Sequence, residues 1–395
     1  MLAPALRLAI VLSHPTQYYS PWFRWLRAQT GISLRVFYLW DFGLTSQRDR
    51  QFGTKIKWDT DLTGGYDWEL VPNRSRDPGT HHFGGLENPG LPDRLAAYAP
   101  TALLVFGYNW NSHLRAIWWA RRRGIPLLFR GDSHFLGRGT PALLRRLLLG
   151  LLYRQFSAVT YVGQANREYF GALGVAPGKL FFAPHSVDAT AFDPANPALR
   201  AEADRMRREL GLEGKRVLLF AGKMTDRKQP RELLQTFLTV ASPEHALVFV
   251  GEGPEKPALE ALASTQADRT VRFLPFANQS EMPSRYLMAD IFVLPSRGFY
   301  ETWGLAVNEA MHLGVPCLVS DLVGCQRDLV VPGETGWVFP ASDMDALATT
   351  LRRALEIPDA ELARLRTNCL ARIAGYTYEQ TTAGLMAALA YLKPA

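Results

Sequence analysis

The feature that most constrains the fold is a regular alternation of short apolar, β-rich runs with segments of helical periodicity, repeated in two rounds along 395 residues. Such alternation predicts parallel sheets that are covered by helices on both faces. In the first round, strands are expected at 6–12, 33–39, 102–106, 126–130 and 158–162, and helices at about 20–28, 112–123, 141–154 and 164–172. In the second, strands are expected at 216–221, 246–251, 270–274, 291–295 and 316–319, and helices at about 229–241, 256–265, 281–288, 303–313 and 343–356.

Two rounds of this pattern predict two domains, because single cores stop growing before this chain length. The expected fold class is α/β, with two doubly wound, Rossmann-like domains that face each other across a cleft. The segment 193–204 has two prolines close together and indicates a linker, so the domains are placed at 1–192 and 193–375. A C-terminal helix within 376–395 is expected to pack back on the N-terminal domain. The Gly-, Asp-, Asn- and Pro-rich stretch 41–100 predicts long loops with little regular structure, and such loops are usually functional.

The net charge of +7 is spread unevenly between the two halves. Residues 1–190 carry 22 Lys and Arg against 12 Asp and Glu, a net charge of +10, whereas 191–395 carry 22 against 25, a net charge of −3. The basic half includes a leucine-rich helix with Arg145, Arg146 and Arg154, which favours an anionic membrane surface as a partner. The alternative is a core helix with a solvated basic edge. We expect no nucleic-acid partner, because no nucleic-acid-binding motif is present.

The cysteines and the hydropathy pattern bear on location. Three cysteines without C-x2-C spacing argue against a disulfide framework and a zinc knuckle, which makes a reducing cytoplasm the default. No run of about 18 uncharged apolar residues is present, so no transmembrane helix is expected. The predicted location is the cytoplasm, at the inner face of the cell membrane if the basic helix docks there.

The stretch "ETWGLAVNEAMHLGVPCLVS" places two glutamates, Glu301 and Glu309, around the start of a helix expected near Trp303. Unpaired amides of Trp303, Gly304 and Leu305 would favour an anion such as a phosphate at this point. Eight residues of helix separate the two carboxylates by roughly 12 Å along the axis. A diphosphate at the helix start would then have one carboxylate on each flank, where each could accept hydrogen bonds from sugar hydroxyls. The alternative is a helix-start charge at Glu301 and a surface residue at Glu309.

Two lysines strengthen the phosphate interpretation. Lys223 and Lys228 lie in a loop between the first strand of the second half and its helix. Two cations at such a turn suit a diphosphate leaving group, although a basic loop taken alone is more often solvated.

Together these motifs resemble retaining glycosyltransferase family 4, the GT-B glycosyl transferases of group 1, and the resemblance covers about residues 215–340. It rests on G-K-x4-K at Gly222, Lys223 and Lys228, V-G-x-G-P at 250–254, P-S-x4-E-x-W-G-L-x3-E at 295–309 and E-A-M-x2-G-V-P at 309–316. The family commonly has Arg where this chain has Lys223, which keeps the charge but loses bidentate geometry.

The resemblance implies a nucleotide-sugar donor held by the second domain, transfer with retained configuration, and no metal or other cofactor. Lys223 and Lys228 would neutralise the diphosphate, and amides near Gly304 and Leu305 would bind its oxygens. Glu301 would hold the hexose hydroxyls and Glu309 the ribose. The donor-binding set predicted by the resemblance comprises Gly222, Phe276 near the base, Trp303, Gly304, Leu305 and Glu309.

The first half resembles the family only loosely, and its candidates are polar residues after strands. His14 and Gln17 follow the first strand, Asn109 lies after the third, and His185 replaces part of a family turn; all four are predicted to line the cleft or bind acceptor. Family members often place a sugar-contacting His near "RGDSHF", and here Asp132 and His134 both remain candidates for a catalytic role.

The resulting hypothesis is a metal-independent hexosyltransferase that moves sugar to a glycan or lipid-linked acceptor in bacterial-type polysaccharide or glycolipid synthesis. The alternatives are a nucleotide-sugar epimerase on a similar fold and a non-catalytic, membrane-associated nucleotide-sugar-binding protein. The D-x-D at Asp59–Asp61 lies in the irregular stretch and is not expected to bind metal, while Asp343 is expected to cap a helix.

Overall fold

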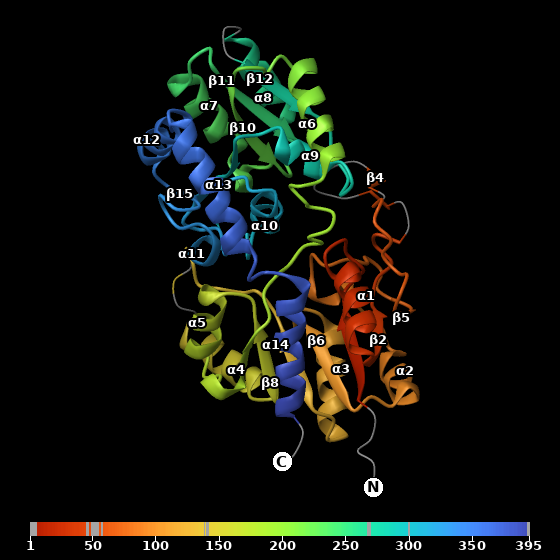
Figure 1. Ribbon diagram of the computed structural model, residues 1–395. Coiled ribbons are helices and arrows are strands. Elements are labelled where there is room, and N and C mark those ends of the chain that lie inside the picture. Colours follow the sequence, from red (N-terminus) through yellow and green to blue (C-terminus); the bar gives the residue numbers. More distant parts are fainter. Residues whose placement is uncertain are drawn as a thin grey trace.

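The computed structural model describes residues 6–44, 47–48, 55–56, 58–137, 139, 142–266, 270–298 and 301–392. It contains two large sheets in which all strand pairs are parallel, one built from each half of the chain (Figure 1). This arrangement confirms the predicted α/β class with two doubly wound halves.

The first sheet has the strand order β5-β2-β1-β6-β7-β8-β9. Its strands are β1 (Arg7–Leu12), β2 (Ser33–Tyr38), β5 (Asp67–Leu70), β6 (Ala102–Phe106), β7 (Leu127–Arg130), β8 (Ala158–Tyr161) and β9 (Leu180–Phe182). The helices of this half are α1 (Tyr19–Thr30), α2 (Leu91–Tyr98), α3 (Asn111–Arg122), α4 (Leu143–Tyr153) and α5 (Gln164–Ala172), with short 3-10 turns at η1 (Phe83–Gly85) and η2 (Pro177–Lys179). A separate antiparallel pair joins β3 (Gln47–Arg48) to β4 (Lys55–Ile56).

The second sheet has the strand order β12-β11-β10-β13-β14-β15. Its strands are β10 (Arg216–Ala221), β11 (His245–Val250), β12 (Thr270–Leu274), β13 (Ile291–Leu294), β14 (Cys317–Ser320) and β15 (Gly336–Phe339). The helices are α6 (Pro197–Glu209), α7 (Pro230–Val240), α8 (Lys256–Ser264), α9 (Met282–Leu287), α10 (Leu305–His312), α11 (Gln326–Leu329), α12 (Met344–Leu355) and α13 (Asp359–Ile373), with a 3-10 turn at η3 (Asp226–Lys228).

Each sheet buries both of its faces, as continuous apolar strands require. Side chains of α2, α3, α4 and α5 pack on one face of the first sheet, and those of α1 and the last helix, α14 (Tyr378–Tyr391), pack on the other. The second sheet is likewise covered by two separate apolar clusters. Among the described residues, no helix is both long and apolar enough to cross a membrane.

The chain returns at its C-terminal end to the first sheet, where α14 contacts α1, β8 and β9 (Figure 1). The approach is close: a Cβ added to Gly384 would lie 1.8 Å from the carbonyl oxygen of Phe182. Trp22 of α1 also donates from Nε1 to Oγ1 of Thr382 at 3.0 Å. The last helix therefore joins the core of the first half.

The expected linker 193–204 is wrong in part, because helix α6 begins at Pro197 within it. Asn196 caps this helix by accepting a hydrogen bond from the amide of Ala198 at 3.0 Å. Proline at the first helical position after an Asn cap is a helix-start signal, since the missing amide is not needed there. The two prolines were therefore misread as a break.

The stretch 41–100 also holds more regular structure than predicted. Strand β5 extends the first sheet beside β2, and helix α2 covers the sheet with Leu91 and Leu95. The β5 pattern is missed because it lies at the sheet edge and is mostly exposed, so it lacks an apolar run. The residues 45–46, 49–54 and 57 of this stretch lie outside the described residues.

Candidate active site

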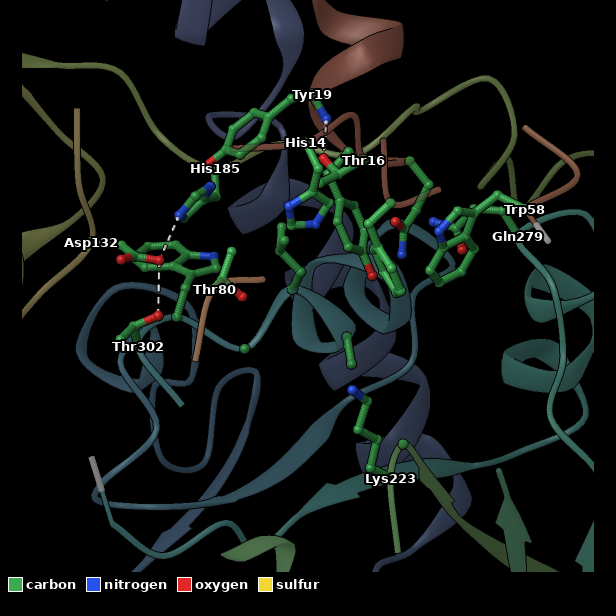
Figure 2. A pocket seen from close by; sticks show the side chains of 18 of the residues that line it. His14, Thr16, Tyr19, Trp58, Thr80, Asp132, His185, Lys223, Gln279 and Thr302 are labelled. Carbon is green, nitrogen blue, oxygen red and sulfur yellow. Dashed lines mark hydrogen bonds and ion pairs between the residues drawn. The ribbon is translucent and has the colours of Figure 1, made fainter. Parts of the chain in front are cut away.

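A cavity of about 1270 Å³ lies at the carboxyl ends of strands from both sheets and is lined by residues of both halves of the chain. Ligands of open α/β sheets bind at this edge. Figure 2 looks into it, with Lys223 reaching in from one half and His14, Tyr19 and Asp132 lying across from it. The predicted cleft is therefore present.

Helix α10 opens onto the cavity, but it begins at Leu305 and not near Trp303 as predicted. The reason is Gly304, whose backbone is left-handed (φ 97°, ψ 60°), a conformation that glycine adopts without strain. An added Cβ would also meet Val323 at 2.9 Å. The amide of Val307 bonds to the carbonyl of Gly304 at 2.9 Å, whereas the amides of Leu305 and Ala306 precede the first helical bond, and both residues line the cavity.

Trp303 is buried behind this helix start and holds it in place. Its indole donates from Nε1 to Oδ1 of Asn308 at 2.7 Å, and Asn308 in turn donates to the carbonyl of His185 at 3.1 Å. This chain of bonds ties the first turn of α10 to the first half of the molecule. Trp303, Gly304 and Leu305, which are predicted to bind the donor, all line the cavity.

Glu301 lies just before the helix start and contacts a lysine directly. Its Oε2 forms an ion pair with Lys228 and accepts a hydrogen bond from Ser296 at 2.9 Å. The cation and the carboxylate, which are predicted to contact different parts of the ligand, are thus neighbours in the cavity. An anionic ligand placed here would share Lys228 with Glu301.

The loop after β10 supplies the other predicted phosphate contacts. Gly222 and Lys223 line the cavity, and Lys228 follows in η3. The amide of Met224 donates to the carbonyl of Glu252 at 2.9 Å, which ties this loop to the loop after β11. Both lysines therefore lie at the carboxyl end of the central strand, near the start of α10.

Glu309, on the second turn of α10, is buried and only 4% exposed, which rules out a surface role. Three side chains donate to it: Tyr286 at 2.7 Å, Gln279 at 3.0 Å and, from the other half of the chain, Tyr18 at 3.1 Å. Burial raises the pKa of Glu309 above its usual value, and these three hydrogen bonds oppose that shift. Its carboxylate still lines the cavity.

Phe276 lines the cavity near Glu309, and Trp58 of the first half meets its ring at 6.0 Å between centroids, edge to face. Beside this pair, Asp59 accepts a hydrogen bond from the amide of Ser280 at 3.1 Å. Asp61 closes its own turn by accepting from the amides of Thr63 and Gly64. The D-x-D carboxylates therefore have structural partners, one across the cavity mouth and one within a turn.

Asp132 contributes the carboxylate of the first half. Its Oδ2 accepts a hydrogen bond from Oγ1 of Thr302 at 2.8 Å and lies 3.5 Å from Nε2 of His185 (Figure 2). Burial acts to raise the pKa of Asp132, but its bonds to His185 and Thr302 outweigh burial and hold the pKa below its usual value. The site therefore keeps this carboxylate charged.

His14 and Gln17 also line the cavity, as predicted. Burial lowers the pKa of His14 to about 4, so its ring is neutral at neutral pH. Nδ1 of His14 lies 3.0 Å from the hydroxyl of Ser13. Its ring meets those of Trp40 and Phe42 edge to face at 5.5 and 5.4 Å, which makes this wall aromatic.

Two predicted residues do not line the cavity. His134 is buried behind it and faces the carbonyl of Glu301 with Nε2 at 3.5 Å, while its Nδ1 accepts from the amide of Leu136. Of the two candidates in this segment, Asp132 reaches the cavity and His134 supports the backbone of Glu301. Asn109 is exposed and lies outside the cavity lining, and its acceptor role stays a prediction. It sits in the turn that leads into α3, which carries it away from the cavity.

Sequence reasoning missed several cavity residues. They are Tyr18, Trp40, Phe42, Trp58, Asn73, Thr80, Gln279, Tyr286 and Thr302. Most come from loops, where no periodicity marks them. The aromatic residues of the long-loop stretch 41–100 could have indicated the members from the first half of the chain. The sequence predicts only that this stretch is functional, without indicating which of its residues line the cavity.

Two parallel α/β sheets that place carboxylates, lysines and a helix start around one shared cavity form the architecture of the GT-B fold. The chain belongs to the group 1 glycosyl transferases, as its motifs predicted. The family model "Glycosyl transferases group 1" matches residues 202–370. A D-inositol 3-phosphate glycosyltransferase of Frankia alni is 32% identical over 356 residues, which cover 80% of this chain and 84% of that protein.

Other relatives match over a shorter range. The GDP-mannose-dependent alpha-(1-6)-phosphatidylinositol monomannoside mannosyltransferase of Mycolicibacterium smegmatis is 32% identical over 209 residues, 51% of this chain and 53% of that protein. A D-inositol 3-phosphate glycosyltransferase of Thermomonospora curvata is 33% identical over 214 residues, 51% of this chain and 49% of that protein. The chain thus spans about half the length of these two relatives.

Solved structures agree on the fold. HepE of Anabaena, in complex with UDP and glucose, superposes with a TM-score of 0.72 over 98% of this chain and 100% of that one, at 16% identity. A glycosyltransferase of Rickettsia africae superposes with a TM-score of 0.75 over the whole of both chains, at 12% identity. At these identities the likeness establishes the architecture alone.

Proposed function

We propose that the chain transfers a hexose from a nucleoside diphosphate sugar to a hydroxyl of an acceptor, with retention of configuration, as a family 4 enzyme. The observation that carries this proposal is the grouping of Lys223, Lys228, the start of α10 and two carboxylates in one cavity. The UDP bound to HepE and the GDP-mannose in the name of the Mycolicibacterium relative support a nucleotide-sugar donor.

In this proposal the diphosphate lies at the start of α10. The first amides of α10 and Lys223 contact its oxygens, and Lys228 is shared between the phosphates and Glu301. Glu301 then holds hexose hydroxyls on one flank. Glu309 holds the ribose on the other flank, with Phe276 and Trp58 beside the base.

The chemistry follows from this placement. The bond between the anomeric carbon and the diphosphate breaks, the acceptor oxygen forms a new bond to that carbon on the same face, and the acceptor proton passes to the departing phosphate. Negative charge grows on the diphosphate, and preorganised cations and amides stabilise it. Two lysines can supply that stabilisation, so we propose that no metal or other cofactor is required.

The acceptor enters from the first half of the chain. Asp132 and His185 face the hexose position, and His14 and Gln17 lie beside the aromatic wall of Trp40 and Phe42. Aromatic rings suit the apolar face of a sugar ring. We therefore propose a glycan or a lipid-linked saccharide as acceptor, in polysaccharide or glycolipid synthesis, with the enzyme in the cytoplasm at the inner face of the membrane.

The test is a donor screen with UDP-glucose and GDP-mannose among the nucleotide sugars, with glycan and glycolipid extracts as acceptors. We expect one donor to release nucleoside diphosphate only when an acceptor is present. EDTA should leave the rate of this release unchanged, and the product should keep the anomeric configuration of the donor. Donor turnover to an epimer without acceptor would instead indicate an epimerase. Donor binding without any turnover would indicate a non-catalytic binding protein.

A further inference from the structure

Helix α4 turns a row of leucines outward. Five of them, which we call the leucine face, are between 54% and 72% exposed: Leu143, Leu144, Leu147, Leu148 and Leu151. Only Leu149 and Tyr153 of this helix are buried against the first sheet. Single exposed leucines are ordinary, but five on one short helix form a contiguous apolar surface that marks an interaction site.

Arginines border the leucine face. At 3.6 residues a turn, the five leucines fall within an arc of about 140° around the helix, with Arg145 beyond one edge and Arg146 beyond the other. Arg154 lies at the C-terminal end of the same arc. All three arginines are exposed. An apolar face flanked by arginines is the pattern of a helix that lies in the plane of a membrane interface.

Carboxylates are nearly absent from this part of the chain. Between Asp93 and Glu168 the sequence contains a single acidic residue, Asp132, and that residue lies in the cavity. Within the described residues, Arg145, Arg146 and Arg154 form no ion pair with a carboxylate. Their charge is therefore available to an anionic partner.

A second helix on the same face of the first sheet carries an exposed tryptophan and exposed arginines. Ile117 of α3 and Leu149 of α4 belong to the same core cluster, so both helices cover one face of the first sheet. On α3, Trp118 is 64% exposed and is followed by the exposed Arg121 and Arg122. Tryptophan and arginine are residues that settle at the level of lipid headgroups.

We propose that the leucine face of α4, with its bordering arginines and Trp118, docks on an anionic lipid bilayer. The leucines enter the boundary between headgroups and acyl chains, and the arginines contact lipid phosphates. A second copy of the chain is a poorer occupant, because a symmetric contact through this face would bring the arginines of both copies together without carboxylates to balance them.

Docking would place the first half of the chain against the membrane. Figure 1 shows α4 in the half that carries β8 and α14, and the loop between β7 and α4 contains the cavity residue Asp132. If the proposed function holds, this half takes the acceptor, so an acceptor anchored in the bilayer would reach the cavity from the docked side. The docking itself does not depend on the proposed function and is measured without donor or acceptor.

The experiment is co-sedimentation of the full chain with phosphatidylcholine vesicles that contain about 30% phosphatidylglycerol, compared with pure phosphatidylcholine vesicles. Wild type is expected to bind the anionic vesicles at least about tenfold more tightly, and about 1 M salt should weaken that binding because it screens the arginines. The double substitution Leu147→Asp/Leu148→Asp should reduce binding at least about tenfold, because it puts two charges in the face that enters the lipid.

A second test variant and two controls complete the set. Arg145→Glu/Arg146→Glu, on α4, should abolish the preference for anionic vesicles. The matched control Arg352→Glu/Arg353→Glu, at an adjacent exposed pair on α12 in the second half of the chain, should keep that preference. Leu370→Asp, at a leucine of α13 that is 39% exposed, should leave binding unchanged. Melting temperatures should stay near wild type in all four, because the changed side chains are exposed.

Three outcomes would overturn the proposal. The first is that wild type does not bind anionic vesicles. The second is that the Leu147→Asp/Leu148→Asp variant binds these vesicles as tightly as wild type does. A dimer in solution that this variant dissociates, without vesicle binding by wild type, would assign the face to a second copy. Release of nucleoside diphosphate from the donor without vesicles should be the same in wild type and variant, so failed docking and failed sugar transfer remain distinguishable.

Discussion

The phenol of Tyr18 donates a hydrogen bond across the cavity to Oε1 of Glu309 at 3.1 Å, and so links residues from the two halves of the chain. A carboxylate offers about four acceptor positions, and Glu309 already uses three, for Tyr18, Gln279 and Tyr286. Two vicinal ribose hydroxyls need two positions. If Glu309 binds the ribose as proposed, one present partner must leave, and Tyr18, from the opposite half, is the one we expect to leave.

Tyr18→Phe removes that competition. Wild type is first tested with UDP and with GDP. We expect the nucleotide that binds wild type to bind this variant several-fold more tightly, because the hydrogen bond between Tyr18 and Glu309 is worth about 1 kcal/mol. The variant without ligand should melt at a lower temperature, since the buried carboxylate loses one donor. Calorimetric titration gives the affinities. Tyr38→Phe is the control: the hydroxyl of Tyr38 bonds to Tyr66 and not to Glu309, so its loss should lower stability without tightening nucleotide binding. Unchanged or weaker nucleotide binding by Tyr18→Phe would contradict the account.

Asp132→Asn tests the carboxylate of the first half. The amide oxygen can still accept from Thr302, so the local fold should survive. Loss of the charge near the hexose should reduce the rate of transfer at least about tenfold, while nucleoside diphosphate affinity stays within about twofold. Steady-state kinetics and titration measure the two quantities. Asp188→Asn, at a carboxylate that accepts hydrogen bonds from Thr190 in its own turn and lies outside the cavity lining, serves as the control. If the affinity for nucleoside diphosphate fell by the same factor as the rate of sugar transfer, Asp132 would act on donor binding instead.

His113, which lies outside the cavity lining, should make the free energy of unfolding depend on pH. Both of its ring nitrogens are buried without a hydrogen-bond partner among the described residues, and burial lowers its pKa to about 3. The unfolded chain takes up a proton as the pH falls below about 6.5, whereas folded His113 stays neutral until about 3, so stability is lost as the pH falls through that window. At pH 5 this loss is about 2 kcal/mol.

His113→Phe should remove that contribution, because a neutral ring of similar size remains. The free energy of unfolding of the variant should fall less steeply between pH 7 and pH 5 than that of wild type, as measured by denaturant titration. Ile117→Leu, at a buried neutral side chain of the same helix, should keep the steepness of the wild-type profile. Parallel profiles for wild type and His113→Phe would show that His113 does not govern acid stability.

The sequence predicted the second half of the site better than the first, for a physical reason. Lys223, Lys228, Glu301 and Glu309 belong to continuous strand–loop–helix units, where short-range spacing determines position. The contacts of Tyr18 with Glu309 and of Asp132 with Thr302 join segments 291 and 170 residues apart, so no local pattern reveals them.

The fold shows the same division between local and distant determinants. Buried strands such as β10 and helices such as α5 end where the apolar pattern ends, as predicted. The start of α6 was missed because proline was read as a break and its Asn cap was not weighed. The start of α10 depends on the left-handed backbone of Gly304, which periodicity does not report.

The most direct test of the central claim is the rate of sugar transfer by Lys228→Ala compared with Lys256→Ala. Each lysine forms an ion pair with a glutamate, Lys228 with Glu301 in the cavity and Lys256 with Glu252 outside its lining, so the two substitutions remove equivalent pairs. The account predicts that Lys228→Ala lowers the transfer rate at least about 100-fold, because the departing diphosphate loses a cation, while Lys256→Ala stays within about twofold of wild type. Equal rates for the two folded variants would contradict the assignment of this cavity as the site of transfer.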